Sequence, residues 1–369
     1  MRTSPQRTRR EFQSWFRTRL AVTEHGRIHI QRGLASRPIL LLRSGFMIRI
    51  RNQRHLLLAL CVSGVLMARA AEIVTHPFAG ITLIARSEAS PRNVHLHVVL
   101  VDLTTPGLSF KLTPPSGSRD TVRQTTLDFL TQEKAQIALN VHFFVPFPSD
   151  EVEANVVGFA ASQGKVYSPF EAQPVGSAYS DQSYAIMAYA PAINIDAANR
   201  VTLVRRDPQY PDNRHCLPQI VPWNVLSGSA QIVTDGVKTI PHYSHLPEGL
   251  KASKTYSENH SWYDLPRART AVGITADQKT LVLLAVEQAG GSAGMTVGEA
   301  ADLLIKDYRT AQALNLDGGG STTLVLQDPH TRTGRIVTTA SGPSQGRAVG
   351  SNLAIFVPAL RTAGMSPSP

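Results

Sequence analysis

The residues best suited to chemistry lie in one short motif near the C-terminus, Asn315-Leu-Asp-Gly-Gly-Gly-Ser-Thr-Thr323. Three consecutive glycines cost much backbone entropy on folding, so they indicate unusual dihedral angles or a close backbone approach. Amides exposed in such a turn, beside Ser321, could bind an anion. Asp317 could act as general acid or base, nucleophile or metal ligand; alternatively, it caps the amides of a tight turn. The motif lacks a P-loop lysine and the spacing of a dinucleotide fingerprint, which excludes both nucleotide patterns.

Two further segments carry arginines just before apolar strands. Arg267 and Arg269 precede one such strand, and Arg347 precedes another near the C-terminus. A guanidinium can hold phosphate through paired hydrogen bonds, so these residues could bind a phosphate group. An arginine at the start of a strand is more commonly a solvated end or a member of a structural ion pair.

Polar groups also follow two other predicted strands. Asn140 and His142 stand beside Phe143 and Phe144, and amide and imidazole groups next to aromatic faces suit a sugar. The two phenylalanines could equally belong to the core. The segment Asn224-Val-Leu-Ser-Gly-Ser229 completes this series of strand-end motifs.

A metal site has one weak candidate in the sequence. The segment Asn93 to Leu103 alternates apolar and other residues as a half-buried strand does, and this alternation puts His95 and His97 on one face. Such a pair could ligate a metal, although histidines on the surface of a strand are more common. The spacing of histidines and aspartates does not favour a metal centre.

The elements that position Asp317 are predicted as strand, helix and strand. Thr280 to Glu287 is a continuous β-rich run, and Leu314 to Asp317 is a short apolar strand. Between them, Thr296 and Glu299 form a capping box at the start of an amphipathic helix. Asp317 would then lie at the carboxyl end of a strand, where ligand sites of α/β folds tend to lie.

Short strands dominate the middle of the chain, and Asp120 can cap a helix that carries Val122, Leu127 and Leu130. We therefore expect an α+β or α/β fold. It would consist of mixed β-sheets with flanking helices, in a single large domain with a C-terminal β-α-β unit.

The net charge of +10 over 369 residues is concentrated at the N-terminus. Residues 1–70 contain 14 arginines, no lysine and two glutamates, which leaves 23 basic and 25 acidic residues for the remainder. The remainder is therefore close to neutral. The basic pI gives no argument for a nucleic-acid partner, and none is expected.

The basic segment is interpreted as a leader. From Met47 the chain has a basic region, the apolar run Leu56 to Met67 and an A-x-A cleavage signal, as in a secretory signal peptide. The apolar run is too short for a membrane-spanning helix of ~20 residues; the alternative is a basic tail before a membrane anchor. We expect an exported bacterial protein, periplasmic or secreted. The expected divisions are a doubtful extension (1–46), the signal peptide (47–70), the main domain (71–360) and a disordered tail (361–369).

Taken in order, these motifs resemble the phosphodiester glycosidase family, whose bacterial members are relatives of N-acetylglucosamine-1-phosphodiester α-N-acetylglucosaminidase. The resemblance spans most of residues 94–357. Two departures are visible: Val141 and His142 stand where family members often have two glycines, and Glu287-Gln-Ala-Gly replaces an Asp-Gly-Arg turn. The matching segments are Asp102-Leu103, Asn140 to Phe144, Leu226 to Gly228, Arg269 to Ala271, Gly294 to Glu299, Asn315 to Ser321, and Arg347 with Asn352.

The resemblance implies a hydrolase that cleaves a sugar-1-phosphodiester at the anomeric carbon and acts on phosphodiester-linked sugars of envelope or exopolysaccharide glycoconjugates. No cofactor is expected. The rivals are a non-catalytic protein that binds anionic polysaccharide, and a metal phosphodiesterase using Asp317, Asn140 and His142. The implied catalytic residues are Asp317, Arg269, Asn140 and, as a reserve second carboxylate, Glu287; the implied substrate-binding residues are His142, Arg347, Gly318, Gly319, Gly320, Ser321, Ser227 and Gly228.

Overall fold

The computed structural model describes residues 71–173, 186–240, 263–339 and 342–358, all within the compact unit Gly64–Pro369. The extension, the signal peptide and the tail expected from the sequence lie outside the described residues. None of the helices within the described ranges is long and apolar enough to cross a membrane.

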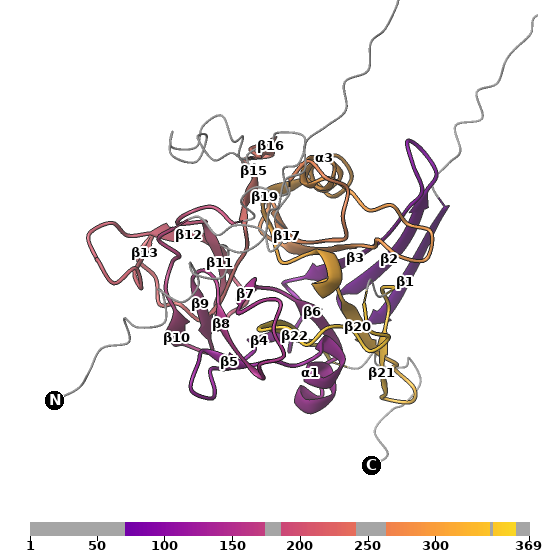
Figure 1. Cartoon of the computed structure of the whole chain (residues 1–369). Coiled ribbons are helices and arrows are strands. Elements are labelled where there is room, and N and C mark those ends of the chain that lie inside the picture. The colour runs from indigo at the N-terminus through magenta and orange to yellow at the C-terminus, as the bar shows by residue number, and fades with distance from the viewer. Residues whose placement is uncertain (1–70, 174–185, 241–262, 340–341, 359–369) are drawn as a thin grey trace, which may run out of the picture. The chain divides into compact units, whose positions relative to one another are not determined.

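An eight-stranded antiparallel sheet forms the largest element of the fold (Figure 1). Strands that are distant in sequence pair within it, as β3 does with β18. Both β18 and β19 pair antiparallel with β17, so they run parallel to each other with β17 between them. In sheet order its strands are β1 (Ala71–Phe78), β2 (Ile81–Glu88), β3 (Val94–Asp102), β18 (Thr280–Val286), β17 (Arg269–Thr275), β19 (Thr310–Asn315), β15 (Ala230–Thr234) and β16 (Val237–Lys238).

Three smaller sheets, also antiparallel, complete the β structure. The six-stranded sheet contains β10 (Lys165–Ser168), β9 (Ala160–Ser162), β14 (Asn224–Ser227), β11 (Ala192–Ile195), β12 (Val201–Arg206) and β13 (Cys216–Leu217). The five-stranded sheet contains β21 (Gly334–Ile336), β20 (Leu324–Gln327), β6 (Ile137–Asn140), β22 (Asn352–Phe356) and β4 (Ser109–Leu112), and the three-stranded sheet β5 (Thr121–Val122), β8 (Glu153–Val156) and β7 (Phe144–Val145).

The expected α+β or α/β class with flanking helices is wrong. Among the described residues there are two α-helices, α1 (Thr126–Glu133) and α3 (Val297–Tyr308), against four antiparallel sheets. The strand, helix and strand before Asp317 do occur, as β18, α3 and β19, with β17 lying between the two strands in the sheet. The rest of the described chain does not repeat this unit and pairs its strands antiparallel. The fold is mostly β. Its short strands pair with sequence-distant partners through antiparallel ladders, and these pairings are not visible in the local sequence pattern.

The two α-helices test the expected caps. The capping box is confirmed: Thr296 Oγ1 accepts from Glu299 N at 3.1 Å, and Glu299 Oε2 accepts from Thr296 N at 2.8 Å. The cap expected at Asp120 is wrong, since Thr125 caps α1. Asp120 instead accepts a hydrogen bond from Val156 N at 2.9 Å, and β5 intervenes before the helix begins.

The core lies on both faces of the eight-stranded sheet, as β3 illustrates. Leu96 and Val98 pack in the cluster that includes the buried side of α3, which lies beside β15, β17 and β19 (Figure 1). Val99 and Val101 pack in the cluster shared with the five- and six-stranded sheets. This packing brings the end of β6 next to β17 and β19, where the candidate site is found.

Candidate active site

Asp317 lies where the eight-stranded and five-stranded sheets meet. Leu316 N donates to Thr270 O at 2.8 Å, which ties the chain to β17. Asp317 N donates to Val141 O at 2.9 Å, just beyond the end of β6. The residue therefore follows a strand, as expected, but stands two residues beyond the end of β19.

Asn140, the last residue of β6, is fully buried and uses its side-chain amide within the protein. Its Nδ2 donates to Asp317 O at 2.7 Å. Its Oδ1 accepts from Thr323 N at 3.0 Å and from Thr270 Oγ1 at 3.1 Å. These bonds join β6, β17 and the glycine turn, so the geometry favours positioning of Asp317 over contact with a sugar. The expected catalytic role stays a prediction.

The triple glycine forms a turn that close packing requires. A Cβ on Gly318 would lie 2.7 Å from Ala268 O, and Gly319 has φ near +59°. The Gly319 amide donates to Ala268 O at 2.8 Å, and the Ser321 amide donates to Gly318 O at 3.2 Å. Because these two amides serve the fold and the Gly318 amide bonds to the Asp317 carboxyl group, the expected anion-binding turn is reduced to the amide of Gly320.

Asp317 is 8% exposed, and its environment sets its proton affinity. Burial raises the pKa of Asp317 to about 7, although the Ser321 hydroxyl, the charge of Arg347 and the Gly318 amide all act to lower it. A carboxyl group with a pKa near 7 exists in both protonation states near neutral pH. It can therefore exchange a proton with a substrate or with water.

Arg347 lies over the glycine turn. Its Nη1 donates to Ser321 Oγ at 3.3 Å, and its guanidinium carbon lies 4.5 Å from the centre of the Phe147 ring. A Cβ on Gly320 would lie 2.3 Å from Nη2, so the guanidinium lies directly against this glycine. The half-buried guanidinium is placed to receive an anion beside Asp317. No pattern in the sequence indicated that Phe147 supports it.

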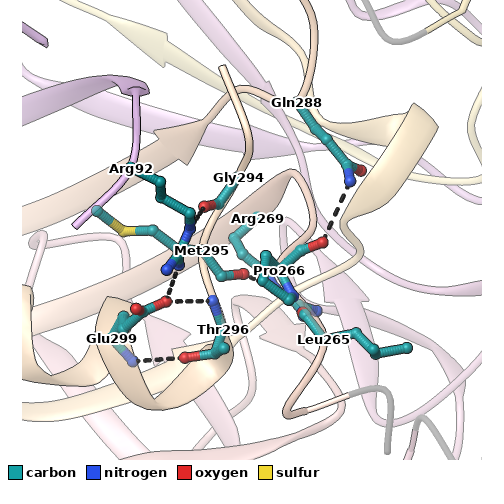
Figure 2. Close-up of polar contacts among 9 residues, drawn as sticks. All are labelled: Arg92, Leu265, Pro266, Arg269, Gln288, Gly294, Met295, Thr296 and Glu299. Atoms are coloured by element: carbon teal, nitrogen blue, oxygen red, sulfur yellow. Dashed lines mark hydrogen bonds and ion pairs between the residues drawn. The ribbon is translucent and has the colours of Figure 1, made fainter. Parts of the chain in front are cut away.

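Arg269 has a different environment, although its motif looked equivalent. It is fully buried, its Nε donates to Met295 O at 2.9 Å, and its Nη2 donates to Leu265 O (Figure 2). Burial, assisted by the charge of Arg267, lowers the pKa of Arg269 to about 9, so it remains protonated at neutral pH. These bonds join the start of β17 to the turn before α3. They favour a positioning role, and phosphate binding by Arg269 stays a prediction.

Glu287 follows β18 and is 3% exposed. Its Oε1 accepts from Thr339 N at 2.8 Å and lies 2.9 Å from His97 Nε2, while Oε2 lies 3.8 Å from His95 Nδ1. Burial acts to raise the pKa of Glu287, but the bonds from His97 and Thr339 outweigh it and hold the pKa below its usual value. The carboxylate is therefore ionised at neutral pH and already partnered.

His95 and His97 thus share a strand face, as the sequence indicated, and both face a carboxylate. Within residues 71–173, 186–240, 263–339 and 342–358, no group of three His, Cys, Asp or Glu side chains is placed to hold a metal ion. The metal phosphodiesterase, whose expected residues include Asn140, stays an alternative hypothesis.

Next to the site, contacts between strands of different sheets involve three expected binding residues, His142, Ser227 and Gly228. His142 Nε2 accepts from Ser227 N at 3.0 Å, and Nδ1 lies 3.0 Å from Ser351 Oγ. Burial lowers the pKa of His142 to about 3, so the ring stays neutral. A Cβ on Gly228 would lie 1.9 Å from Asn315 O. These contacts account for the three residues by packing; their binding of substrate stays a prediction.

The structure thus divides the expected site residues into two groups. Asp317, Ser321 and Arg347 form one contiguous group, and no hydrogen bond or ion pair of the described residues links Glu287 to it. The others mainly hold the strands in place. The sequence did not single out Thr270, which bonds to Asn140 and to the Leu316 amide, or Thr339, whose amide donates to Glu287. Thr270 lies within the matching segment Arg269 to Ala271, and that position was the available signal.

The fold is similar to that of two solved structures. The catalytic domain of zebrafish N-acetylglucosamine-1-phosphodiester alpha-N-acetylglucosaminidase, auto-inhibited by pro-peptide, aligns with a TM-score of 0.51 and 19% identity, over 78% of this chain and 88% of that one. A hypothetical protein from Synechocystis aligns with a TM-score of 0.51 and 16% identity, over 78% of this chain. The alignment covers 64% of the Synechocystis chain. No curated protein sequence matches.

The fold class is therefore the one that these two solved structures share, and in this chain it places Asp317 beside Arg347. The sequence model for phosphodiester glycosidases matches residues 150–356, more than half of the chain. The chain belongs to the phosphodiester glycosidase family. The family that the sequence motifs resembled is thereby confirmed.

Proposed function

We propose that the protein hydrolyses a sugar-1-phosphodiester at the anomeric carbon and releases the free sugar and a phosphomonoester. Family membership supports the reaction class. The observation that carries the proposal is the buried carboxyl group of Asp317, with a pKa near 7, beside the half-buried guanidinium of Arg347. A phosphate-linked substrate needs both a cation for its charge and a group that exchanges a proton near neutral pH.

Asp317 serves as the base in this mechanism. It accepts a proton from water while the water oxygen forms a bond to the anomeric carbon. The bond from that carbon to the phosphate oxygen breaks, and its electron pair leaves with the phosphate. Because a phosphate monoester is a good leaving group, stabilisation of its charge matters more than its protonation. Arg347 and the amide of Gly320 supply that stabilisation.

Arg269 and Asn140 act on this site through the backbone. Asn140 holds the carbonyl of Asp317, and Arg269 joins the segment before β17 to the turn before α3 through the carbonyls of Leu265 and Met295. Their substitution is expected to misplace Asp317 and Arg347. This assignment gives both residues a function without requiring their buried polar atoms to reach the substrate.

The expected leader supports action outside the cytoplasm, on phosphodiester-linked sugars of the envelope or of exopolysaccharide. This part of the proposal rests on the sequence from Met47 to Ala70. It is tested by determining the N-terminal residue and the location of the protein in its native host. A mature chain that begins at Ala71 outside the cytoplasm supports it.

Product analysis in water labelled with heavy oxygen tests the reaction. The protein is incubated with a panel of sugar-1-phosphodiesters, with and without chelator, and the label is located by mass spectrometry. Attack at the anomeric carbon places the label in the sugar, whereas attack at phosphorus places it in a phosphate. Label in phosphate, or loss of turnover with chelator, would favour the metal phosphodiesterase, and saturable binding without turnover would favour the binding protein.

The matched variants are Asp317→Asn and Asp277→Asn. Asp277 is an exposed turn residue between β17 and β18, at the end of these strands opposite to Arg269, so its variant controls for the chemical change itself. Asp317→Asn is expected to abolish release of sugar while the protein stays folded. Retained turnover in a folded Asp317→Asn protein would remove the proposed base.

A further inference from the structure

A second surface, on the six-stranded sheet, has the composition of a ligand-binding groove. A cavity of about 710 Å³ lies between the turn from β11 to β12 and the segment that precedes β14; Trp223, Asp196 and Arg200 help to line it. A second cavity of about 210 Å³ includes Tyr210 in its lining. Ile220 lines both cavities, so they are neighbours, and we call the two together the Trp223 groove.

Trp223 is held in place at the larger cavity. Its backbone N donates to Asn194 Oδ1 at 2.7 Å, and its backbone O accepts from Gly164 N at 3.0 Å. A Cβ on Gly164 would lie 3.3 Å from the six-membered part of the indole, so this glycine makes room for the ring. A ring fixed in this way binds a partner with little loss of side-chain entropy.

Two exposed apolar side chains lie in the same groove. Val221, which lines the larger cavity, is 79% exposed. Tyr210, in the smaller cavity, is 39% exposed and stacks on His215 with ring centres 3.7 Å apart. Neighbouring exposed apolar and aromatic side chains in a depression are typical of a binding surface.

The charges of the groove are balanced. In the larger cavity Arg200 Nε bonds to Asp196 Oδ2 at 2.7 Å, and the smaller cavity contains one aspartate and one arginine, Asp207 and Arg214. This balance does not favour a polyanion, which would meet equal numbers of acidic and basic groups. An apolar peptide is also disfavoured, since the centres of protein interfaces are depleted of charged residues.

We propose that the Trp223 groove binds a neutral oligosaccharide chain. One face of a pyranose ring presents C–H groups that pack on an indole, while its edge presents hydroxyl groups that bond to amides, carboxylates and guanidinium groups. The groove offers both, in two consecutive cavities that suit consecutive sugar units. The site does not use Asp317 or Arg347. It would hold a polymer whose phosphodiester is processed elsewhere on the domain.

Fluorescence of Trp223 tests this binding directly. The chain has three tryptophans, and the other two, Trp15 and Trp262, lie outside the described residues. In a full-length Trp15→Phe, Trp262→Phe protein, all tryptophan emission comes from Trp223. Titration with chitohexaose, maltohexaose or cellohexaose is expected to change this emission saturably with at least one sugar, while inorganic phosphate leaves it unchanged. A flat signal with all three sugars at millimolar concentration overturns the proposal.

Two variants locate the site and separate it from hydrolysis. Trp223→Ala is expected to weaken binding of the responding hexasaccharide about tenfold, as for removal of an aromatic anchor; calorimetry measures it, because this variant has lost the reporting indole. Val221→Asp gives a second test that does not disturb the core, because Val221 is exposed; it replaces an apolar contact with a hydrated charge that binding must desolvate. Its binding, measured in the single-tryptophan protein, is expected to weaken similarly, with unchanged turnover of a small sugar-1-phosphodiester.

The outcome separates this proposal from the proposed function. Asp317→Asn should bind the hexasaccharide as the parent protein does. If this variant loses turnover but keeps binding, the Asp317 site and the Trp223 groove are separate sites. Failure of Asp317→Asn to lose turnover would overturn the hydrolase mechanism alone. The groove is not a sugar site if both Trp223→Ala and Val221→Asp bind sugar as the parent does. An emission change that occurs only with an apolar peptide would also overturn the proposal.

Discussion

Two buried acids follow the strands on either side of β17, and their environments act on them in opposite directions. Asp317 follows β19, and burial raises its pKa to about 7. Glu287 follows β18, and the bonds from His97 and Thr339 hold its pKa below the usual value despite burial. Burial alone therefore does not determine the charge of a carboxyl group; the partners that its two oxygens find decide it.

The opposite pKa shifts of Asp317 and Glu287 favour different roles for the two residues. A pair of acids whose pKa values are driven apart commonly divides the tasks of a catalytic site. Asp317 can change its protonation state near neutral pH, whereas Glu287 stays ionised and joins β18 to His97 and to Thr339. We therefore place proton transfer at Asp317. The reserve role of Glu287 as second catalytic carboxylate has less support from its contacts.

The largest expected effect comes from neutralising each acid in turn. Asp317→Asn is expected to lower kcat/KM by about a thousandfold, the usual scale for loss of a general base. Glu287→Gln should lower it by less than about tenfold, since the amide retains the shape of a side chain that only positions its neighbours. The measurement is initial-rate kinetics on one sugar-1-phosphodiester. Equal losses in the two variants would erase the distinction and make Glu287 a catalytic partner.

Arg347 lies beside Asp317 and not beside Glu287, so its substitution tests the site that holds Asp317. Arg347→Ala is expected to lower kcat/KM by about a hundredfold, through loss of charge stabilisation at the phosphate. Arg347→Lys should recover part of the activity, because it keeps the charge without the planar pair of donors. Arg335→Ala, at an exposed position of β21, is the matched control. Similar kinetics for the alanine and parent proteins would remove phosphate binding from Arg347.

The pH profile separates the acids through the direction of their pKa shifts. If Asp317 must be deprotonated to act, kcat/KM should fall about tenfold for each pH unit below its pKa near 7 and level off above it. Glu287 is ionised throughout this range, so Glu287→Gln should keep the same profile. A rate that instead falls as pH rises through 7 would make Asp317 an acid rather than a base.

The sequence was informative wherever the signal was local. Thr296 and Glu299 are three residues apart and predicted the cap of α3 correctly. The glycines after Asp317 indicated a turn with special geometry, and Gly319 has the expected positive φ. Such features depend on a few neighbouring residues, so a short pattern suffices to find them.

The sequence was misleading wherever distant segments decide the structure. Arg269 and Arg347 stand before similar strands, yet the carbonyls of Leu265 and Met295 surround the first and Phe147 lies under the second. The fold class failed for the same reason. The pairing of β3 with β18 joins segments far apart in the chain, and no local pattern shows which strand pairs with which.

The smallest expected effect is on stability, and it should have opposite signs for the two acids. The raised pKa of Asp317 means that folding loses stability as pH rises from the ordinary aspartate value to about 7. Asp317→Asn removes this loss and should raise the free energy of unfolding above pH 7, by about 1 kcal/mol after the lost hydrogen bonds are counted.

Glu287 provides the opposite case, because its lowered pKa contributes stability above the ordinary glutamate value, and this contribution disappears as pH falls through the folded-state pKa. Glu287→Gln should therefore destabilise the protein at neutral pH and have little effect in acid. Urea unfolding of both variants at pH 3, below both ordinary pKa values, and at pH 8 measures the two signs. If both variants shift stability in the same direction at pH 8, the environments of the two acids do not differ as their contacts imply. A stabilised Asp317→Asn protein without activity would show that the position of this carboxyl group costs stability in exchange for function.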